Sequence, residues 1–290
     1  MGEYQAVKTA SQGFKFLRDQ VDVGGPPFCR TDRSLWKYMD FMHNLAEQIL
    51  QAEDTGKKVI WHSILVPREI IASFDNVVPL CLEIFTLIGG YFTEGSTDKF
   101  TGISAGYGIP QDVCSAHRIM DGMVINREIP TPEILVGSTN PCDSIMQSWE
   151  IIQNETQVPK FQYDTPYHFN EDSLAYVVGE NSRLVSFLED HLGQKLNEDL
   201  LRKNLEISQK ADRLIQEVNA LRGTVPSPMH AADNLNNVSM SLNGCTSEVS
   251  IDYFETLKSE MEARLRQGKG VVDKERYRLA WLGGVPLFAG

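Results

Sequence analysis

Two cysteines, Cys114 and Cys142, occupy matching places in the sequence. Each stands at the front of a predicted helix shortly after a proline, in the segments PQDVC and NPC. A thiol at a helix N-terminus has a lowered pKa, and its thiolate form is a good ligand for a soft metal. Two buried structural thiols would follow the same pattern, because free cysteine is among the most buried residue types. The spacing alone leaves metal ligation and core packing open.

The other three cysteines have different settings. Cys81 lies in an apolar run and is predicted to be a core residue, whereas Cys29 and Cys245 lie in polar segments and receive no role. The five cysteines are an odd number, and their spacing is irregular. This pattern does not indicate a disulfide framework, so reduced thiols or metal ligands are expected.

Short apolar runs alternate with helical patterns through residues 57–172. This alternation predicts a parallel α/β sheet with helices on both faces. The predicted strands are residues 57–63, 77–82, 134–138 and 161–164. The predicted helices are residues 34–55, 67–74 and 83–92, with a break at Gly89-Gly90, and one helix after each of Cys114 and Cys142.

The carboxyl ends of these strands form the predicted binding edge, because ligands of parallel α/β sheets sit where the strands lead into helix N-termini. His62 and Ser63 end the first strand, and Glu69 follows in the first turn of the next helix. Cys114 and Cys142 belong to the same edge. An acidic residue also favours a helix N-terminus for electrostatic reasons, so a capping or supporting role for Glu69 stays open.

The sequence outside the sheet is divided into three regions. Residues 1–56 are predicted to form an arm or loop followed by a helix that begins at the N-cap Ser34. Residues 173–272 are predicted to be helical with a polar break, and residues 273–290 follow a charged hinge and open a strand-to-turn unit from Arg276. The predicted helices of the middle region are residues 181–192, 197–222 and 248–266.

The end of the sequence suggests an incomplete unit. A strand without neighbours cannot bury its faces. We therefore expect either that the chain is a fragment, with residues 273–290 starting a second α/β lobe, or that the final strand joins the preceding sheet.

Composition restricts the possible partners. The chain has 290 residues, a formal net charge of −12 and a pI near 5.0. Binding of a nucleic-acid backbone needs clustered Lys and Arg, so nucleic acid is not expected as a partner. No apolar run is long enough for a membrane helix, and the first residues lack a secretory signal. A soluble, cytoplasmic protein without membrane contact is expected.

Five motifs follow one another along the chain. They are SILVPREII (63–71), IPQDVCS (109–115), PTPEILVG (130–137), CDS (142–144) and ERYRLAWLGGVP (275–286). This ordered series covers most of the chain and resembles the subunits of the radical 2-hydroxyacyl-CoA dehydratases and benzoyl-CoA reductases. Proteins of that family are oxygen-sensitive, heteromeric, cytoplasmic iron-sulfur enzymes built from flavodoxin/Rossmann-like lobes, and they act on CoA thioesters.

The resemblance implies a role for the paired cysteines. Cys114 and Cys142 would be two of three thiolate ligands of a 4Fe-4S cluster, which leaves the fourth iron open to substrate or water. The family offers no match for Cys245 as the third ligand. That ligand is expected in the second lobe, beyond Gly290.

The resemblance also suggests functions for the polar residues near the cysteines. His62 and Ser63 could bind the thioester, and Ser63 and Glu69 could take part in catalysis by moving a proton. His117 and Arg118, one turn after Cys114, could hydrogen-bond cluster sulfurs or hold a CoA phosphate. An ordinary solvated pair at His117 and Arg118 is the alternative.

The segment TGISAGYG, residues 101–108, is predicted to be a glycine-rich loop. It could approach a phosphate or simply turn the chain. It lacks the lysine of a P-loop and the spacing of a dinucleotide fingerprint, so binding of ATP or NAD is not expected.

The leading hypothesis is a subunit that adds one electron to an acyl-CoA. The ketyl-type radical beside the thioester carbonyl would make a nearby C–H bond acidic, so that water is lost or a ring is reduced. The implied partners are a sister subunit, an ATP-dependent iron-sulfur activator protein and the acyl-CoA substrate. The alternatives are a double-cubane-type reductase of small molecules and a non-catalytic scaffold subunit.

Overall fold

A four-stranded parallel sheet forms the centre of the computed structural model, which describes residues 4–23, 32–92, 95–272 and 274–279. The strands lie in the order β2-β1-β3-β4. The predicted parallel α/β fold is confirmed, and every strand overlaps its predicted range. The strands are β1 (Lys58–His62), β2 (Val77–Cys81), β3 (Ile134–Ser138) and β4 (Lys160–Tyr163).

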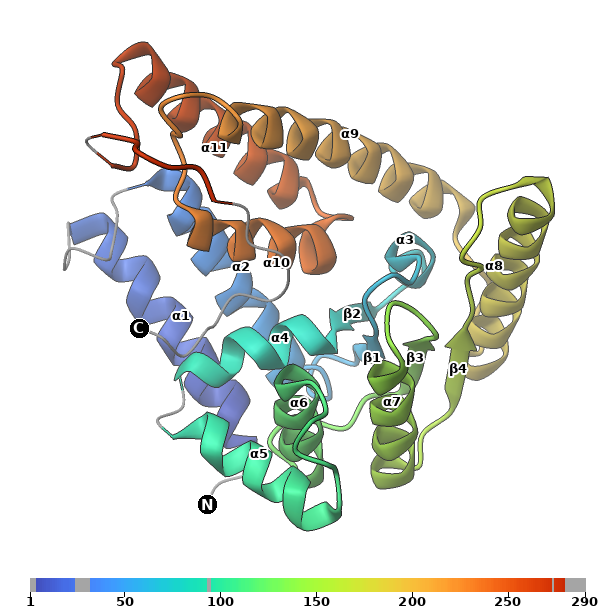
Figure 1. Cartoon of the computed structure of the whole chain (residues 1–290). Coiled ribbons are helices and arrows are strands. Elements are labelled where there is room, and N and C mark those ends of the chain that lie inside the picture. Colours follow the sequence, from blue (N-terminus) through green and yellow to red (C-terminus); the bar gives the residue numbers. More distant parts are fainter. Residues whose placement is uncertain (1–3, 24–31, 93–94, 273, 280–290) are drawn as a thin grey trace.

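Side chains of each strand alternate between the two faces of the sheet. In β1, Val59 and Trp61 join one apolar core, while Ile60 joins the other. Both faces are covered, which explains why the strands are almost continuously apolar. The first face carries α2 (Arg33–Leu50), α4 (Leu82–Gly89), α6 (Ser115–Ile125) and α7 (Asp143–Thr156), and the second carries α3 (Arg68–Ile71) and α8 (Glu171–Leu192) (Figure 1).

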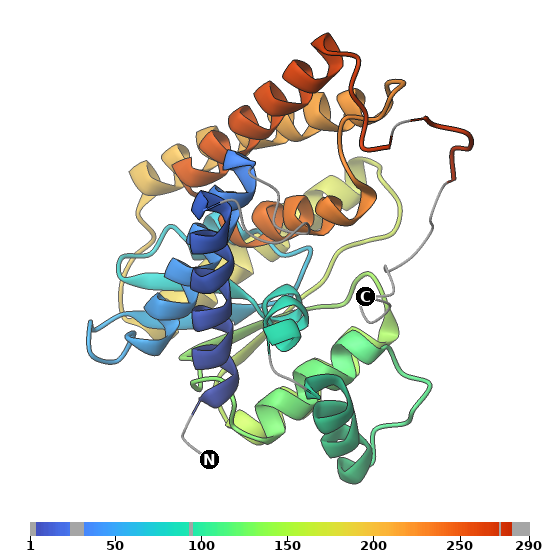
Figure 2. The same ribbon diagram turned by 90° about the vertical axis from the view of Figure 1, so that its left-hand side faces the viewer.

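The N-terminal region contains a helix, α1 (Gln5–Val23), where the sequence analysis predicts an arm or loop. Figure 2 shows α1 running lengthwise across the front of the molecule. Buried Ala6, Ala10 and Phe14 recur at helical spacing and pack in the same core as α2. The prediction was wrong because it gave more weight to the glycines and prolines that follow than to this periodicity. Cys29 lies outside the described residues.

The predicted glycine-rich loop at residues 101–108 is also wrong. These residues belong to the helix α5 (Ser96–Tyr107), which ends at Gly108 with a φ of 103°. Phe100 is fully buried, and a Cβ on Gly122 of α6 would lie 2.2 Å from the Phe100 carbonyl oxygen. Gly122 therefore permits the close packing of α5 and α6, while a Cβ on Gly102 or Gly106 would meet open space. The segment is helical and does not form a phosphate-binding loop.

The helical region after β4 is larger than predicted. Helix α8 begins ten residues before the predicted start at 181, with Asn170 as its N-cap. The predicted polar break contains a further helix, α10 (Asn234–Gly244), whose buried face includes Asn237, Ser239 and Asn243, so its polarity concealed it. Helices α9 (Glu198–Arg222) and α11 (Glu248–Arg266) confirm the predictions. The break after α4 is a 3-10 turn, η1 (Gly90–Phe92), and another, η2 (Ala231–Asp233), precedes α10.

The predicted strand from Arg276 lies mainly outside the described residues. Residues 274–279, which the structure does describe, have no helix or strand. The second lobe and the boundary at residue 273 remain predictions.

The N-cap of α9 offers a test of this fold. Asn197 Oδ1 accepts a hydrogen bond from the Leu200 amide at 3.0 Å. Asn197→Ala should lower the free energy of unfolding by about 1 kcal/mol, because an orphan amide of the first turn loses its acceptor. Urea denaturation measures this change. The matched control Asn154→Ala, at an exposed position inside α7, should leave stability unchanged or slightly raised.

Candidate functional site

The order of the strands defines one crevice at the carboxyl edge of the sheet. From β1 the chain continues to β2 on one side, whereas β3 and β4 lie on the other side. This reversal between β1 and β3 is a topological switch point, where parallel α/β sheets bind ligands. Two loops leave the sheet there, residues 63–67 after β1 and residues 139–142 after β3. Cys142 ends the second loop.

Cys114 and Cys142 are the N-cap residues of α6 and α7, and both are exposed. The predicted helix starts at both cysteines are confirmed. His117 Nδ1 and Ser144 Oγ form a hydrogen bond of 2.9 Å between the two helices, and Ser144 Oγ lies 3.3 Å from Cys142 Sγ. His117 is one turn after Cys114. The bond therefore holds the N-termini of both cysteine helices together.

A second hydrogen bond joins the same helices one turn further along. Ser148 Oγ donates to Asp121 Oδ2 at 2.9 Å, and both residues are buried. The pair lies four residues beyond His117 on α6 and four residues beyond Ser144 on α7. The cysteine helices are thus connected by two successive side-chain bonds that fix their relative position.

The hydrogen bond between His117 and Ser144 can be tested by a double-mutant cycle. Ser144→Ala should lower the free energy of unfolding by about 1 kcal/mol, the usual net value of one hydrogen bond. Adding His117→Ala should then cost less than His117→Ala alone, because the partner is already missing. Chemical denaturation of the four proteins measures the coupling. Strictly additive losses would contradict the interaction.

Ser63 is hydrogen-bonded to a buried acid that the sequence analysis missed. Ser63 Oγ donates to Glu83 Oε1 at 2.6 Å, and Trp149 Nε1 donates to the same oxygen at 3.0 Å. Burial raises the pKa of Glu83, although both hydrogen bonds oppose the shift. The available signal was an acid in the first turn of the otherwise apolar segment LEIFTLIGG, directly after β2. Neighbouring Cys81 is fully buried, which confirms its predicted place in the core.

Asp121 is a second buried acid behind the cysteines. Burial and, to a smaller extent, the charge of Glu83 raise its pKa to about 7, against the opposing hydrogen bond from Ser148. Its Oδ1 atom is buried and has no hydrogen-bond partner among the residues that the structure describes. A carboxyl group with such a pKa can accept or release a proton near neutral pH. Asp121 lies on α6, and its pKa responds to the charge of Glu83, so the two buried acids interact electrostatically.

His62 lies on the opposite side of the sheet from this pair. Its Nδ1 is 2.9 Å from the Ser63 carbonyl oxygen, and its Nε2 is 3.2 Å from Arg68 Nη1. Burial, and then the charge of Arg68, lower the pKa of His62 to about 3. The neutral ring is enclosed between β1 and α3. The structure thus separates His62 from Ser63, although the two are adjacent in sequence.

Glu69 lies on the other face of the sheet from the cysteine helices, and the Arg118 side chain binds backbone carbonyl groups of other segments. Glu69 Oε1 accepts a hydrogen bond from Ser208 of α9, and its side chain lines a cavity beside α3. Arg118 Nη2 donates to the Thr101 carbonyl oxygen at 3.1 Å, and Nη1 donates to that of Gln111 at 3.3 Å. Arg118 therefore ties α5 and the loop before Cys114 to α6. Of the predicted site residues, the structure unites His117 and both cysteines.

The two thiols match part of a soft-metal site. Within the described ranges, no group of three or more His, Cys, Asp or Glu side chains could hold a metal ion. Two exposed thiols on neighbouring helix N-termini have the donor chemistry that iron-sulfur clusters use. They fit such a cluster only together with at least one further ligand. A third ligand beyond Gly290 remains a prediction.

None of the helices in the part of the chain that the structure describes combines the length and the apolar character that a membrane span needs.

Comparison with known proteins gives a consistent result. The chain is 24% identical over 259 residues to the (R)-2-hydroxyisocaproyl-CoA dehydratase alpha subunit of Clostridioides difficile, which covers 84% of this chain and 62% of that protein. It is 22% identical over 244 residues to the (R)-phenyllactyl-CoA dehydratase alpha subunit of Clostridium sporogenes, with 81% and 59% covered. It is 24% identical over 274 residues to a benzoyl-CoA reductase subunit of Thauera aromatica, with 86% and 62% covered.

The chain spans about three fifths of the length of these relatives. A family model described as "2-hydroxyglutaryl-CoA dehydratase, D-component" matches residues 63–289. This range begins at Ser63 and includes the loops of the switch point and both cysteine helices. The chain therefore belongs to the family of the 2-hydroxyglutaryl-CoA dehydratase D-component.

Proposed function

We propose that this chain is part of an enzyme subunit that binds a CoA thioester at the switch point and transforms it by one-electron chemistry. The observation that carries the proposal is the pair of exposed cysteines, held together at two helix N-termini by the His117–Ser144 bond. Relatives named as dehydratase and reductase subunits support the substrate class. Dehydration of a 2-hydroxyacyl-CoA and reduction of an aromatic acyl-CoA are the two outcomes considered.

We assign Cys114 and Cys142 to a 4Fe-4S cluster, with a third ligand outside this chain segment. When bound, the cluster would supply a single electron to the thioester. Ser144 positions the Cys142 thiol, and His117 positions Ser144. The positive end of a helix dipole stabilises a negatively charged ligand at the helix N-terminus.

We assign proton handling to Ser63 and Glu83. Burial keeps the pKa of Glu83 raised, so this acid can hold a proton next to the first residue of the switch-point loop. Ser63 Oγ can pass that proton to a bound group or take one from it, because a hydroxyl both donates and accepts. Asp121, on the cysteine helix α6, is a second buried acid whose raised pKa lets it hold a proton near neutral pH.

The proposed surroundings follow from the same assignment. The partners are a sister subunit and an ATP-dependent activator that delivers the electron, and the compartment is the anaerobic cytoplasm. The three relatives described above are all named as subunits, which supports a heteromeric enzyme.

The test uses the full-length complex, purified anaerobically with its sister subunit and activator. Iron and sulfide should be present, and either a 2-hydroxyacyl-CoA or benzoyl-CoA should be turned over, only without oxygen. Aerobic inactivation should be reversed by anaerobic reconstitution with iron and sulfide. Absence of iron from the anaerobic complex, together with no turnover of any CoA thioester, would reject the proposal.

A further inference from the structure

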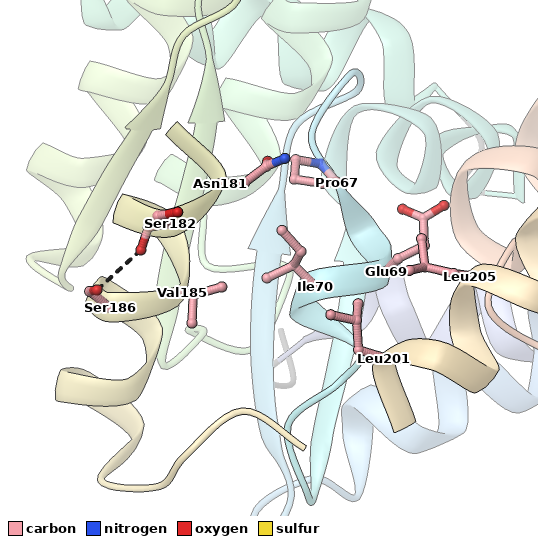
Figure 3. Close-up of a pocket in the computed structure, with 9 residues that line it drawn as sticks. All are labelled: Pro67, Glu69, Ile70, Asn181, Ser182, Val185, Ser186, Leu201 and Leu205. Carbon is pink, nitrogen blue, oxygen red and sulfur yellow. Dashed lines mark hydrogen bonds between the residues drawn. The ribbon is translucent and has the colours of Figure 1, made fainter. Parts of the chain in front are cut away.

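The two sides of the short helix α3 have different surroundings. On one side, Figure 3 shows Ile70 pointing toward Val185 of α8 across a cavity of about 560 Å³. Pro67 and Glu69 also line this cavity, but Arg68 between them does not. The buried guanidinium group of Arg68 instead forms hydrogen bonds with groups of β1 and β2. Arg68 thus connects α3 to the end of β1.

The contacts of Arg68 determine which ring nitrogen of His62 carries the proton. Arg68 Nη1 donates to the Pro79 carbonyl oxygen at 2.8 Å and to His62 Nε2 at 3.2 Å. Burial keeps the ring neutral, since it lowers the pKa of His62 to about 3. A guanidinium group has no acceptor, so Nε2 accepts and Nδ1 carries the proton. Nδ1–H then donates to the Ser63 carbonyl oxygen at 2.9 Å, which makes a directed chain of two hydrogen bonds.

This chain ends at the start of a strained loop, residues 63–67. Leu65 has a φ of 60°, in the left-handed region that is unfavourable for a leucine. Such a residue persists only where the surrounding contacts impose its conformation. The Ser63 amide donates to the Val136 carbonyl oxygen at 2.9 Å, and the Ser63 carbonyl oxygen accepts from His62. Both polar backbone groups of Ser63 are therefore anchored where the loop leaves the sheet.

One peptide group connects His62 with the buried acid Glu83. The Ser63 carbonyl and the Ile64 amide lie in the same plane and point in opposite directions. Burial raises the pKa of Glu83, whereas the Ser63 hydroxyl, which donates at 2.6 Å, and the Ile64 amide lower it. The bond from His62 to the Ser63 carbonyl therefore also directs the Ile64 N–H toward Glu83.

On the basis of the proposed function, we propose that His62, oriented by Arg68, is a positioning residue that holds Ser63 and Ile64 against Glu83. His62 acts through the peptide group and not on the substrate, because its ring is buried between β1 and α3. Its replacement should disturb proton transfer at Ser63 without weakening substrate binding.

The test compares two replacements of His62 in the full-length complex. The amide nitrogen of asparagine lies near the position of Nδ1, so His62→Asn keeps a donor for the Ser63 carbonyl and loses the contact with Arg68. The amide of glutamine lies near the position of Nε2, so His62→Gln keeps an acceptor for Arg68 and loses the donor. Each variant lacks one buried hydrogen bond, so urea denaturation should show similar losses of stability.

The first readout is the ionisation of Glu83. Trp149 Nε1 donates to Glu83 at 3.0 Å, so its fluorescence reports the protonation of this acid, and the pH-dependent signal that is missing in Glu83→Gln belongs to it. His62→Gln should raise the pKa of Glu83, because the groups that lower it are displaced, whereas His62→Asn should not. Asp121 and Cys81, the other ionisable groups near Glu83, are the same in both variants.

The second readout is turnover of the CoA thioester. In His62→Gln, kcat should fall about ten-fold or more at an unchanged KM, as expected for misplaced proton transfer. His62→Asn should recover most of the lost turnover. His191→Gln is the matched control, because His191 Nδ1 also bonds a backbone carbonyl, that of Phe187 at 2.8 Å, but is exposed on α8. A raised KM at constant kcat in His62→Gln would assign His62 to substrate binding and overturn the inference.

A third measurement needs no folded variant. Nitrogen NMR of the histidine-labelled complex should show a neutral His62 with its proton on Nδ1. The signal is assigned by its loss in either replacement that folds, or by its insensitivity to pH between 5 and 8. A proton on Nε2 would overturn the inference.

These outcomes separate the inference from the proposed function. If the two replacements of His62 give equal kcat and an equal pKa of Glu83 while a CoA thioester is turned over, the positioning role fails and the function stands. If no CoA thioester is turned over but the pKa of Glu83 rises only in His62→Gln, the positioning role stands and the function fails.

Discussion

Replacing Cys142 with serine should remove iron from the full-length complex and lower turnover by about 100-fold or more, since even groups that only orient a metal ligand contribute 10- to 100-fold. The fold should survive the change. Cys142 is exposed and is the N-cap of α7, a position that serine fills well. Iron and sulfide analysis after anaerobic reconstitution measures the loss, and Cys114→Ser should behave in the same way.

Cys245→Ser is the matched control for this prediction. Cys245 follows α10 and is half-buried, and burial raises the pKa of its thiol to about 11, so it stays protonated. Iron content should not change in this variant. If Cys114→Ser and Cys142→Ser also retain full iron and activity, the cysteine pair is not a cluster site and the scaffold alternative is favoured.

The sheet and the cysteine positions could be predicted from the sequence because their signals are local. Apolar runs such as residues 134–138 are bounded by turn residues, and both cysteines directly follow segments that cannot continue a helix. The carboxyl edge of the sheet follows from the alternation of strands and helices, whereas the strand order, and with it the switch point, comes from the structure. These features need no knowledge of distant contacts.

The rest of the site depends on contacts between distant segments. Glu83 becomes notable only when Ser63 and Trp149 converge on one carboxylate oxygen, although they are far apart in the chain. His62 and Ser63 were predicted to lie together at the end of the first strand. Side chains alternate between the two faces of the sheet along β1, so these two point to opposite faces. Helix α10 was missed because its buried side chains are polar, so no apolar period marks it.

Replacing Asp121 with asparagine should stabilise the protein at pH 8. The pKa of Asp121 is raised to about 7 in the folded state from 3.8, so the folded state binds the proton more tightly than the unfolded chain does. The contribution of Asp121 to the free energy of unfolding must then fall as the pH rises from about 4 to 7. Above pH 7 the folded protein carries the full cost of the buried, ionised carboxylate. Asparagine keeps an acceptor for Ser148 and never ionises.

The expected gain at pH 8 is about 2–4 kcal/mol, since the shift corresponds to roughly 3 pKa units at 1.36 kcal/mol each, reduced by relaxation around the site. At pH 4 the aspartate is protonated in the fold, so the two proteins should have similar stability. Urea denaturation at both pH values measures the difference, with exposed Asp190→Asn as the control. A gain of equal size at pH 4 and pH 8 would show that ionisation is not its cause. A smaller pH dependence should remain in Asp121→Asn, because burial also raises the pKa of Glu83.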